Sequence, residues 1–128
     1  MSNGTGSRKI HIVDDDDAVR DSMRALLESL GFDVHDYSSA VEFLNRGGTN
    51  SKGCLLLDLH MPVMSGIDLL DHMQLEGVQL PTIVITGRGD PVLRERALKS
   101  GALALIDKPV SDEALLGAIG RAFGGETA

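Results

Sequence analysis

The chain has 128 residues, a formal net charge of −7 and one cysteine, Cys54. A hydrophobic content of 42% and a charged content of 24% are typical of globular proteins, so we expect one folded domain rather than a disordered chain. One cysteine excludes a disulfide framework and fits a reducing cytoplasm, and the negative charge argues against direct nucleic-acid binding. No apolar run approaches the roughly 18–20 residues that span a bilayer, and the polar start lacks signal-peptide features. We therefore expect a cytoplasmic domain without membrane contact.

Strand and helix patterns alternate five times along the chain. Strands are expected at residues 9–13, 32–37, 54–58, 82–86 and 103–106. Helices are expected to begin at residues that cap helix N-termini, namely Asp17, Ser39, Ser65, Asp90 and Ser111. This order predicts a doubly wound α/β fold, in which a five-stranded parallel sheet carries five helices on its two faces. We take residues 8–124 as the domain, residues 1–7 as a flexible tail, and residues 125–128 as a tail or the start of a linker.

The third expected strand is the segment around which the rest of the chain is organised. Its residues 54–57 are consecutively apolar, which is typical of a strand that is buried on both faces of a sheet. The run ends on a carboxylate, Asp58. A charge at the rim of a core is costly unless other groups compensate it.

The residues that follow the other strands can supply this compensation. The carboxyl ends of parallel strands meet at one edge of the sheet, where ligands bind. Side chains expected there are Asp14, Asp15, Asp58, Thr86 and Lys108. Three carboxylates raise one another's pKa unless a cation joins them, and Mg²⁺ prefers such oxygen ligands. The hydroxyl and ammonium groups suit phosphate oxygens, and an aspartate can be a phosphoryl nucleophile.

With these residues in place, the chain resembles the receiver domain of two-component response regulators over about residues 8–123. The resemblance is carried by residues 12–16, 58–66, 84–87 and the pair Lys108-Pro109. Residues 83–90 look most like the nitrogen-fixation regulator subgroup, whose receivers often precede a helix-turn-helix output domain in transcription regulators. The resemblance implies a flavodoxin-like strand order of 2-1-3-4-5 and a cis Lys108-Pro109 bond.

The resemblance also implies a reaction. Asp58 would accept a phosphoryl group from a sensor histidine kinase or a phosphotransfer protein, Thr86 would be the switch hydroxyl, and Lys108 would pair with the phosphoryl group. Such a domain is a phosphoacceptor switch that assists its own phosphoryl transfer and dephosphorylation, rather than an enzyme acting on other substrates.

The metal implied by the resemblance is Mg²⁺. Its ligands would be Asp15, Asp58 and the backbone carbonyl of His60, with Asp14 acting through water. In the family, the residues two positions after the phosphoacceptor and after the switch hydroxyl tune the phosphoryl lifetime. Here these residues are His60 and Arg88. Both can donate hydrogen bonds, so we predict slow autodephosphorylation.

Two positions depart from the family pattern. Leu105 stands where an aromatic switch residue is usual, so a swinging ring cannot report phosphorylation. Val110 replaces the usual phenylalanine after Lys-Pro. The basic residues of the fourth helix are interpreted as a solvated face, with a partner or homodimer surface formed by the fourth helix and fifth strand as the alternative.

Other functions fit the residues less well. A phosphorylation-independent, receiver-like interaction domain remains an alternative, because Leu105 leaves the readout open. An aspartate-nucleophile phosphatase would carry a second Asp where this chain has His60. A flavin-binding domain of the same topology is disfavoured by the absence of Trp and the single Tyr.

Overall fold

A computed structural model of the chain describes residues 8–87 and 91–124. Its strands are β1 (Lys9–Val13), β2 (Asp33–Tyr37), β3 (Cys54–Asp58), β4 (Thr82–Thr86) and β5 (Ala104–Asp107). Its helices are α1 (Asp17–Ser29), α2 (Ala40–Asn45), α3 (Gly66–Leu75), α4 (Pro91–Lys99) and α5 (Asp112–Ala122), with a short 3₁₀ helix, η2 (Gly48–Asn50). All strand pairs are parallel, and the order β2-β1-β3-β4-β5 confirms the predicted doubly wound fold.

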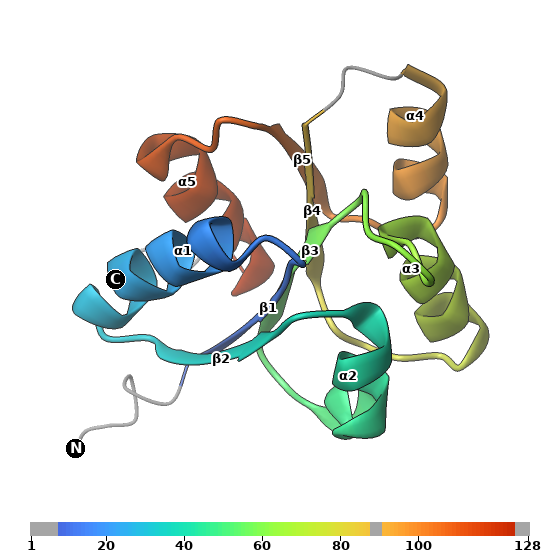
Figure 1. Cartoon of the computed structure of the whole chain (residues 1–128), viewed down its shortest axis with the longest axis horizontal. Helices are drawn as coiled ribbons and strands as arrows, with labels where there is room; N and C mark the ends of the chain where they lie inside the picture. The colour runs from blue at the N-terminus through green and yellow to red at the C-terminus, as the bar shows by residue number, and fades with distance from the viewer. Residues whose placement is uncertain (1–7, 88–90, 125–128) are drawn as a thin grey trace.

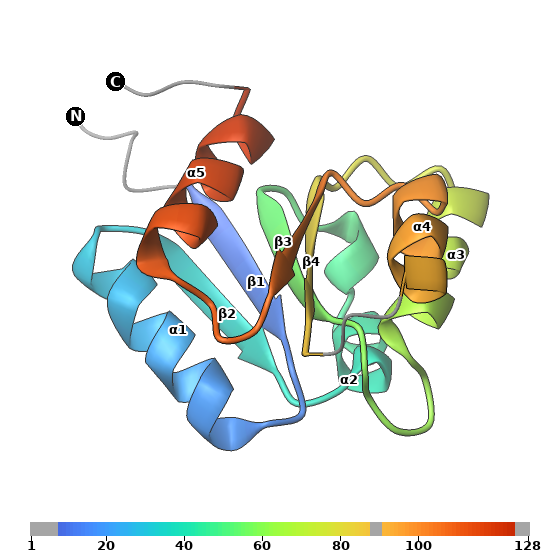
Figure 2. The ribbon, with the colours of Figure 1, turned by 90° about the horizontal axis from the view of Figure 1, so that it is seen from above.

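The sheet separates two hydrophobic layers. Figures 1 and 2 show α1 and α5 on one face of the sheet and α2, α3 and α4 on the other. The five residues of β3 are all buried, and its side chains alternate between the two layers. Leu55 and Leu57 pack on the α2–α4 side, whereas Cys54 and Leu56 pack on the α1–α5 side. This two-sided burial explains why the strand is a continuous apolar run.

Helix caps fix where each helix starts beside the sheet. Ser39, Ser65 and Ser111 are N-caps, as predicted. The expectation for α1 is wrong by one residue, because Asp16 has the extended backbone of a cap and its carboxylate accepts the N–H groups of Ala18 and Val19. The expected cap Asp90 lies outside the described residues.

Two glycines allow close backbone approaches at the two ends of β3. A Cβ atom on Gly66 would lie 2.6 Å from the carbonyl oxygen of Asp58. Gly53 has a φ of +113°, and a Cβ atom there would lie 2.1 Å from the carbonyl oxygen of Lys9. Glycine is therefore required both where β3 begins and where α3 returns against its end.

In the described parts of the chain, no helix is both long and apolar enough to cross a lipid bilayer.

Candidate functional site

The five side chains expected at one edge of the sheet lie together. Asp14 and Asp15 follow β1, Asp58 and Thr86 end their strands, and Lys108 follows β5. Asp14, Asp58 and Thr86 are only 1%, 3% and 1% exposed. A shallow pocket of about 530 Å³ opens above them, and its lining is Asp15, Asp16, Asp58, His60, Gly87 and Lys108.

Three carboxylates and one ammonium group form the centre of this site. One oxygen each of Asp14, Asp15 and Asp58 lies within 4.8 Å of the others. The Nζ atom of Lys108 lies 3.5 Å from Oδ1 of Asp58 and 3.8 Å from Oδ2 of Asp14. Within the described residues, this Oδ2 atom is buried and accepts no hydrogen bond. Among the described residues, one cation thus faces three acids, and these groups together carry an excess of negative charge.

The surroundings of these carboxylates perturb their ionisation. Burial, and secondarily the charge of Asp14, raise the pKa of Asp58 from 3.8 to about 6, against the opposing effects of Lys108 and the His60 N–H. Burial also raises the pKa of Asp14, while its hydrogen bond from the Asp16 N–H lowers it. The ionised forms are therefore costly in the absence of a further cation. The clustered hard oxygens and the unsatisfied buried oxygen fit a divalent ion such as Mg²⁺.

His60 contacts two residues of the site. Its backbone N–H donates to Oδ1 of Asp58 at 3.3 Å, and its ring Nε2 lies 3.2 Å from Oγ1 of Thr86. The sequence places His60 two residues after the phosphoacceptor but gives no sign of its contact with Thr86. The two residues are 26 positions apart, and the pairing of β3 with β4, in which Asp58 lies opposite Ile85, brings them together.

The other singled-out positions lie around this centre. The Lys108-Pro109 bond is cis, and the Lys108 N–H donates to the Thr86 carbonyl at 2.8 Å. Leu105 is half-buried and packs against the α2–α4 layer. Arg94 of α4 forms an ion pair with Asp107, at the end of β5. Arg88 lies outside the described residues.

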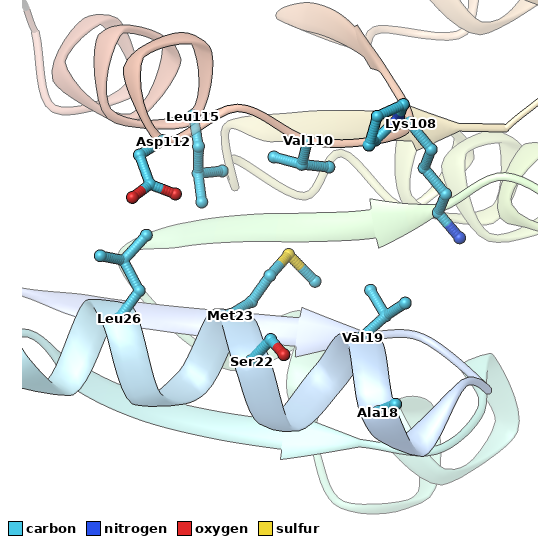
Figure 3. Close-up of a pocket in the computed structure, with 10 residues that line it drawn as sticks. Ala18, Val19, Ser22, Met23, Leu26, Lys108, Val110, Asp112 and Leu115 are labelled. Carbon is cyan, nitrogen blue, oxygen red and sulfur yellow. The ribbon is translucent and has the colours of Figure 1, made fainter.

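A largely apolar groove of about 380 Å³, which the sequence did not reveal, adjoins the site between α1 and α5. Figure 3 shows Val19, Met23 and Leu26 of α1 along one wall, facing Val110 and Leu115. Lys108 lies at one end of the groove and also lines the acidic pocket. The groove therefore borders the candidate site at Lys108.

Residues 10–120 match the family model of the response regulator receiver domain. The chain belongs to this family. Receiver domains are generally non-enzymatic switches that interact with histidine kinases or phosphotransfer proteins. This match confirms the predicted family. Similarity to proteins named FixJ confirms the predicted subgroup.

The curated relatives that the chain matches are longer than this chain. It is 41% identical over 118 residues to the transcriptional regulatory protein FixJ of Azorhizobium caulinodans, covering 92% of this chain and 56% of that protein. It is 46% identical over 110 residues to the response regulator protein TmoT of Ectopseudomonas mendocina, covering 86% and 50%. The chain therefore spans about half the length of these relatives. The crystal structure of FixJ-N is similar along its whole length, with a TM-score of 0.85, 38% identity, and coverage of 100% of this chain and 99% of that one.

Proposed function

We propose that Asp58 of this receiver domain accepts a phosphoryl group from the phosphohistidine of a sensor histidine kinase or a phosphotransfer protein. The observation that carries the proposal is the position of Asp58, a buried carboxylate at the pocket floor with Lys108 Nζ 3.5 Å from its oxygen. A carboxylate oxygen of Asp58 attacks phosphorus, the P–N bond breaks, and the electron pair leaves with the donor imidazole. We assign this function to residues 8–124.

The side chains around Asp58 suit the charges of such a reaction. The ammonium group of Lys108 pairs with the phosphoryl oxygens, and the Thr86 hydroxyl donates to one of them. Phosphoryl transfer depends mainly on positioning and charge stabilisation, so these few groups suffice. The same groups, acting on water as the attacking nucleophile, assist loss of the phosphoryl group. His60 and Arg88 then shield it and slow that loss.

Mg²⁺ is the metal we propose for the acidic pocket. Asp15, Asp58 and the His60 backbone carbonyl would hold it, with Asp14 contributing through water. When bound, Mg²⁺ supplies positive charge against the carboxylates and the phosphoryl oxygens. The raised pKa of Asp58 supports this assignment, and so does the buried Oδ2 atom of Asp14, which accepts no hydrogen bond from the described residues.

The groove between α1 and α5 is where we expect the phosphodonor protein to dock. Its apolar walls suit an amphipathic helix, and Lys108 joins the groove to the acidic pocket. A helix lying along α1 would bring its own side chains to the mouth of the pocket. The donor histidine could thus reach Asp58 without rearrangement of the sheet.

We propose control of transcription as the output, because the longer relatives include proteins named transcriptional regulators. Val92, Leu98 and Leu103 are 72%, 50% and 44% exposed on or beside α4 and β5. This face is therefore our candidate for a homodimer or output contact. Leu105 of β5 has no aromatic ring that could change position on phosphorylation. We propose that repacking of its aliphatic side chain transmits the phosphorylation state instead.

Labelling with acetyl phosphate tests the proposal. Intact-mass measurement should show one phosphoryl adduct on the wild-type protein with Mg²⁺, and none with EDTA or on Asp58→Asn. Decay of the adduct should be faster in His60→Ala and Arg88→Ala than in the wild type. A wild-type protein that gains no adduct would contradict the proposal and favour a phosphorylation-independent interaction domain.

A further inference from the structure

The contact between His60 and Thr86 joins the loop after β3 to the end of β4. The Nε2 atom of His60 lies 3.2 Å from Oγ1 of Thr86, within hydrogen-bonding distance. Thr86 is 1% exposed, so its hydroxyl group is shielded from solvent. The backbone N–H of the same histidine donates to Asp58. One residue therefore contacts both the phosphoacceptor and the hydroxyl that would bind its phosphoryl group.

A threonine hydroxyl has one proton, which it can donate to one strong acceptor at a time. If His60 Nε2 accepts this proton, the proton is not available to a phosphoryl oxygen. Binding of Thr86 to a phosphoryl group then requires the His60 contact to break. The contact would stabilise the unphosphorylated arrangement and oppose the phosphorylated one.

We infer that the His60 side chain is a positioning residue that holds the Thr86 hydroxyl in the unphosphorylated domain. This inference rests on the proposed function and adds a role to the one proposed there for His60. The backbone carbonyl of His60 belongs to the proposed metal site, but substitution of the ring leaves that carbonyl in place. Effects of the ring on Thr86 are therefore separable from effects on the metal.

Beryllofluoride, which forms a tetrahedral phosphoryl-like adduct with a carboxylate, is the probe for this role. Its dissociation constant is measured with Mg²⁺ by ¹⁹F NMR on the wild type, His60→Ala, Thr86→Val and the double variant. Two ratios are compared: the change in dissociation constant that His60→Ala causes when Thr86 is present, and the change that it causes in the Thr86→Val background. His60→Ala should tighten binding about 2- to 10-fold more in the first case than in the second. This range corresponds to one net hydrogen bond. This comparison removes any direct contact between His60 and the adduct, because that contact is common to both backgrounds.

A conservative variant provides the matched control. In His60→Gln, the side-chain amide reaches about as far as Nε2 and should restore most of the wild-type affinity, whereas His60→Leu should behave like His60→Ala. Thr86→Ala takes the place of Thr86→Val if circular dichroism shows that the valine variant does not fold.

The outcomes separate the two proposals. If the wild type binds beryllofluoride but His60→Ala has the same effect in both backgrounds, or weakens binding more when Thr86 is present, the positioning role is overturned and the proposed function stands. If the wild type neither binds beryllofluoride nor accepts phosphoryl from acetyl phosphate, the proposed function fails and the positioning role fails with it.

Discussion

Replacing Asp58 with asparagine should stabilise the metal-free domain at neutral pH, because Asp58 is a charged group that is only 3% exposed. Its pKa is raised from 3.8 to about 6, mainly by burial and then by Asp14. At about 1.36 kcal/mol for each pKa unit, this rise corresponds to about 3 kcal/mol of stability lost above pH 6. The attraction of Lys108 is already included in this pKa, and asparagine keeps the shape of the side chain and can still accept the His60 N–H. We therefore expect a net gain of about 1–3 kcal/mol.

The gain should depend on pH in a defined direction. Below about pH 4, Asp58 is protonated in both folded and unfolded chains and carries no penalty. Between about pH 4 and 6, the unfolded chain has already released this proton while the folded domain still binds it, so the wild-type free energy of unfolding falls as pH rises. Above about pH 6 the full penalty is present. The asparagine variant lacks this contribution, so the two proteins should diverge across the interval.

Urea unfolding followed by circular dichroism, in EDTA at pH 4.5 and pH 7.5, measures the effect. Asp21→Asn is the matched control, because Asp21 is exposed on α1 and should change stability by no more than about 0.5 kcal/mol. Added Mg²⁺ should stabilise the wild type more than Asp58→Asn. The reasoning is refuted if the variant is less stable than the wild type at pH 7.5, or if its gain is the same at both pH values.

Two further predictions concern the backbone beside the site. Val63 has a φ of 68° and is 97% exposed, so Val63→Asn should raise the free energy of unfolding by about 1 kcal/mol, because asparagine tolerates the left-handed conformation. Leu75→Asn, at a position 87% exposed at the end of α3, should gain nothing in the same urea titration, and equal gains would contradict the explanation. Gly66→Ala should cost about 1–3 kcal/mol and slow labelling of Asp58, because a Cβ atom would lie 2.6 Å from the Asp58 carbonyl oxygen. Gly117 of α5 has open space around it, so Gly117→Ala should be neutral or stabilising in thermal unfolding and serves as the control. A Gly66→Ala variant as stable as the wild type would contradict the prediction and show that α3 can shift freely.

Patterns among neighbouring residues were sufficient to predict most of the helices and strands. The continuous apolar run of β3 predicts that the strand is buried on both faces, as the structure has it. The three serine caps lie one residue before the first residue of their helices. These features depend only on neighbours in the chain, so a periodic pattern predicts them. The sequence does not locate the cap of α1 to one residue, because the acidic run 14–17 offers several residues of the same type. Only the extended backbone at Asp16 selects one of them.

The membership of the site was also predictable, because parallel strands place their carboxyl ends at one edge. Once the strands were assigned, Asp14, Asp58, Thr86 and Lys108 had to share that edge. The sequence by itself thus determined the fold class and the set of groups available for chemistry. The distances between these groups were not predictable from the sequence. A loop of a few residues can shift a side chain by several ångströms without changing the sequence pattern.

Only the tertiary structure decided how these groups interact. The pairing of β3 with β4 brings His60 against Thr86, and the turn after β5 brings Lys108 within 4 Å of both Asp14 and Asp58. The raised pKa of Asp58 arises mainly from burial, which depends on every element packed around the site. The groove between α1 and α5 likewise exists only when two helices distant in sequence lie on the same face of the sheet. Such quantities depend on distances through space, and a pattern along the chain carries information only about neighbours.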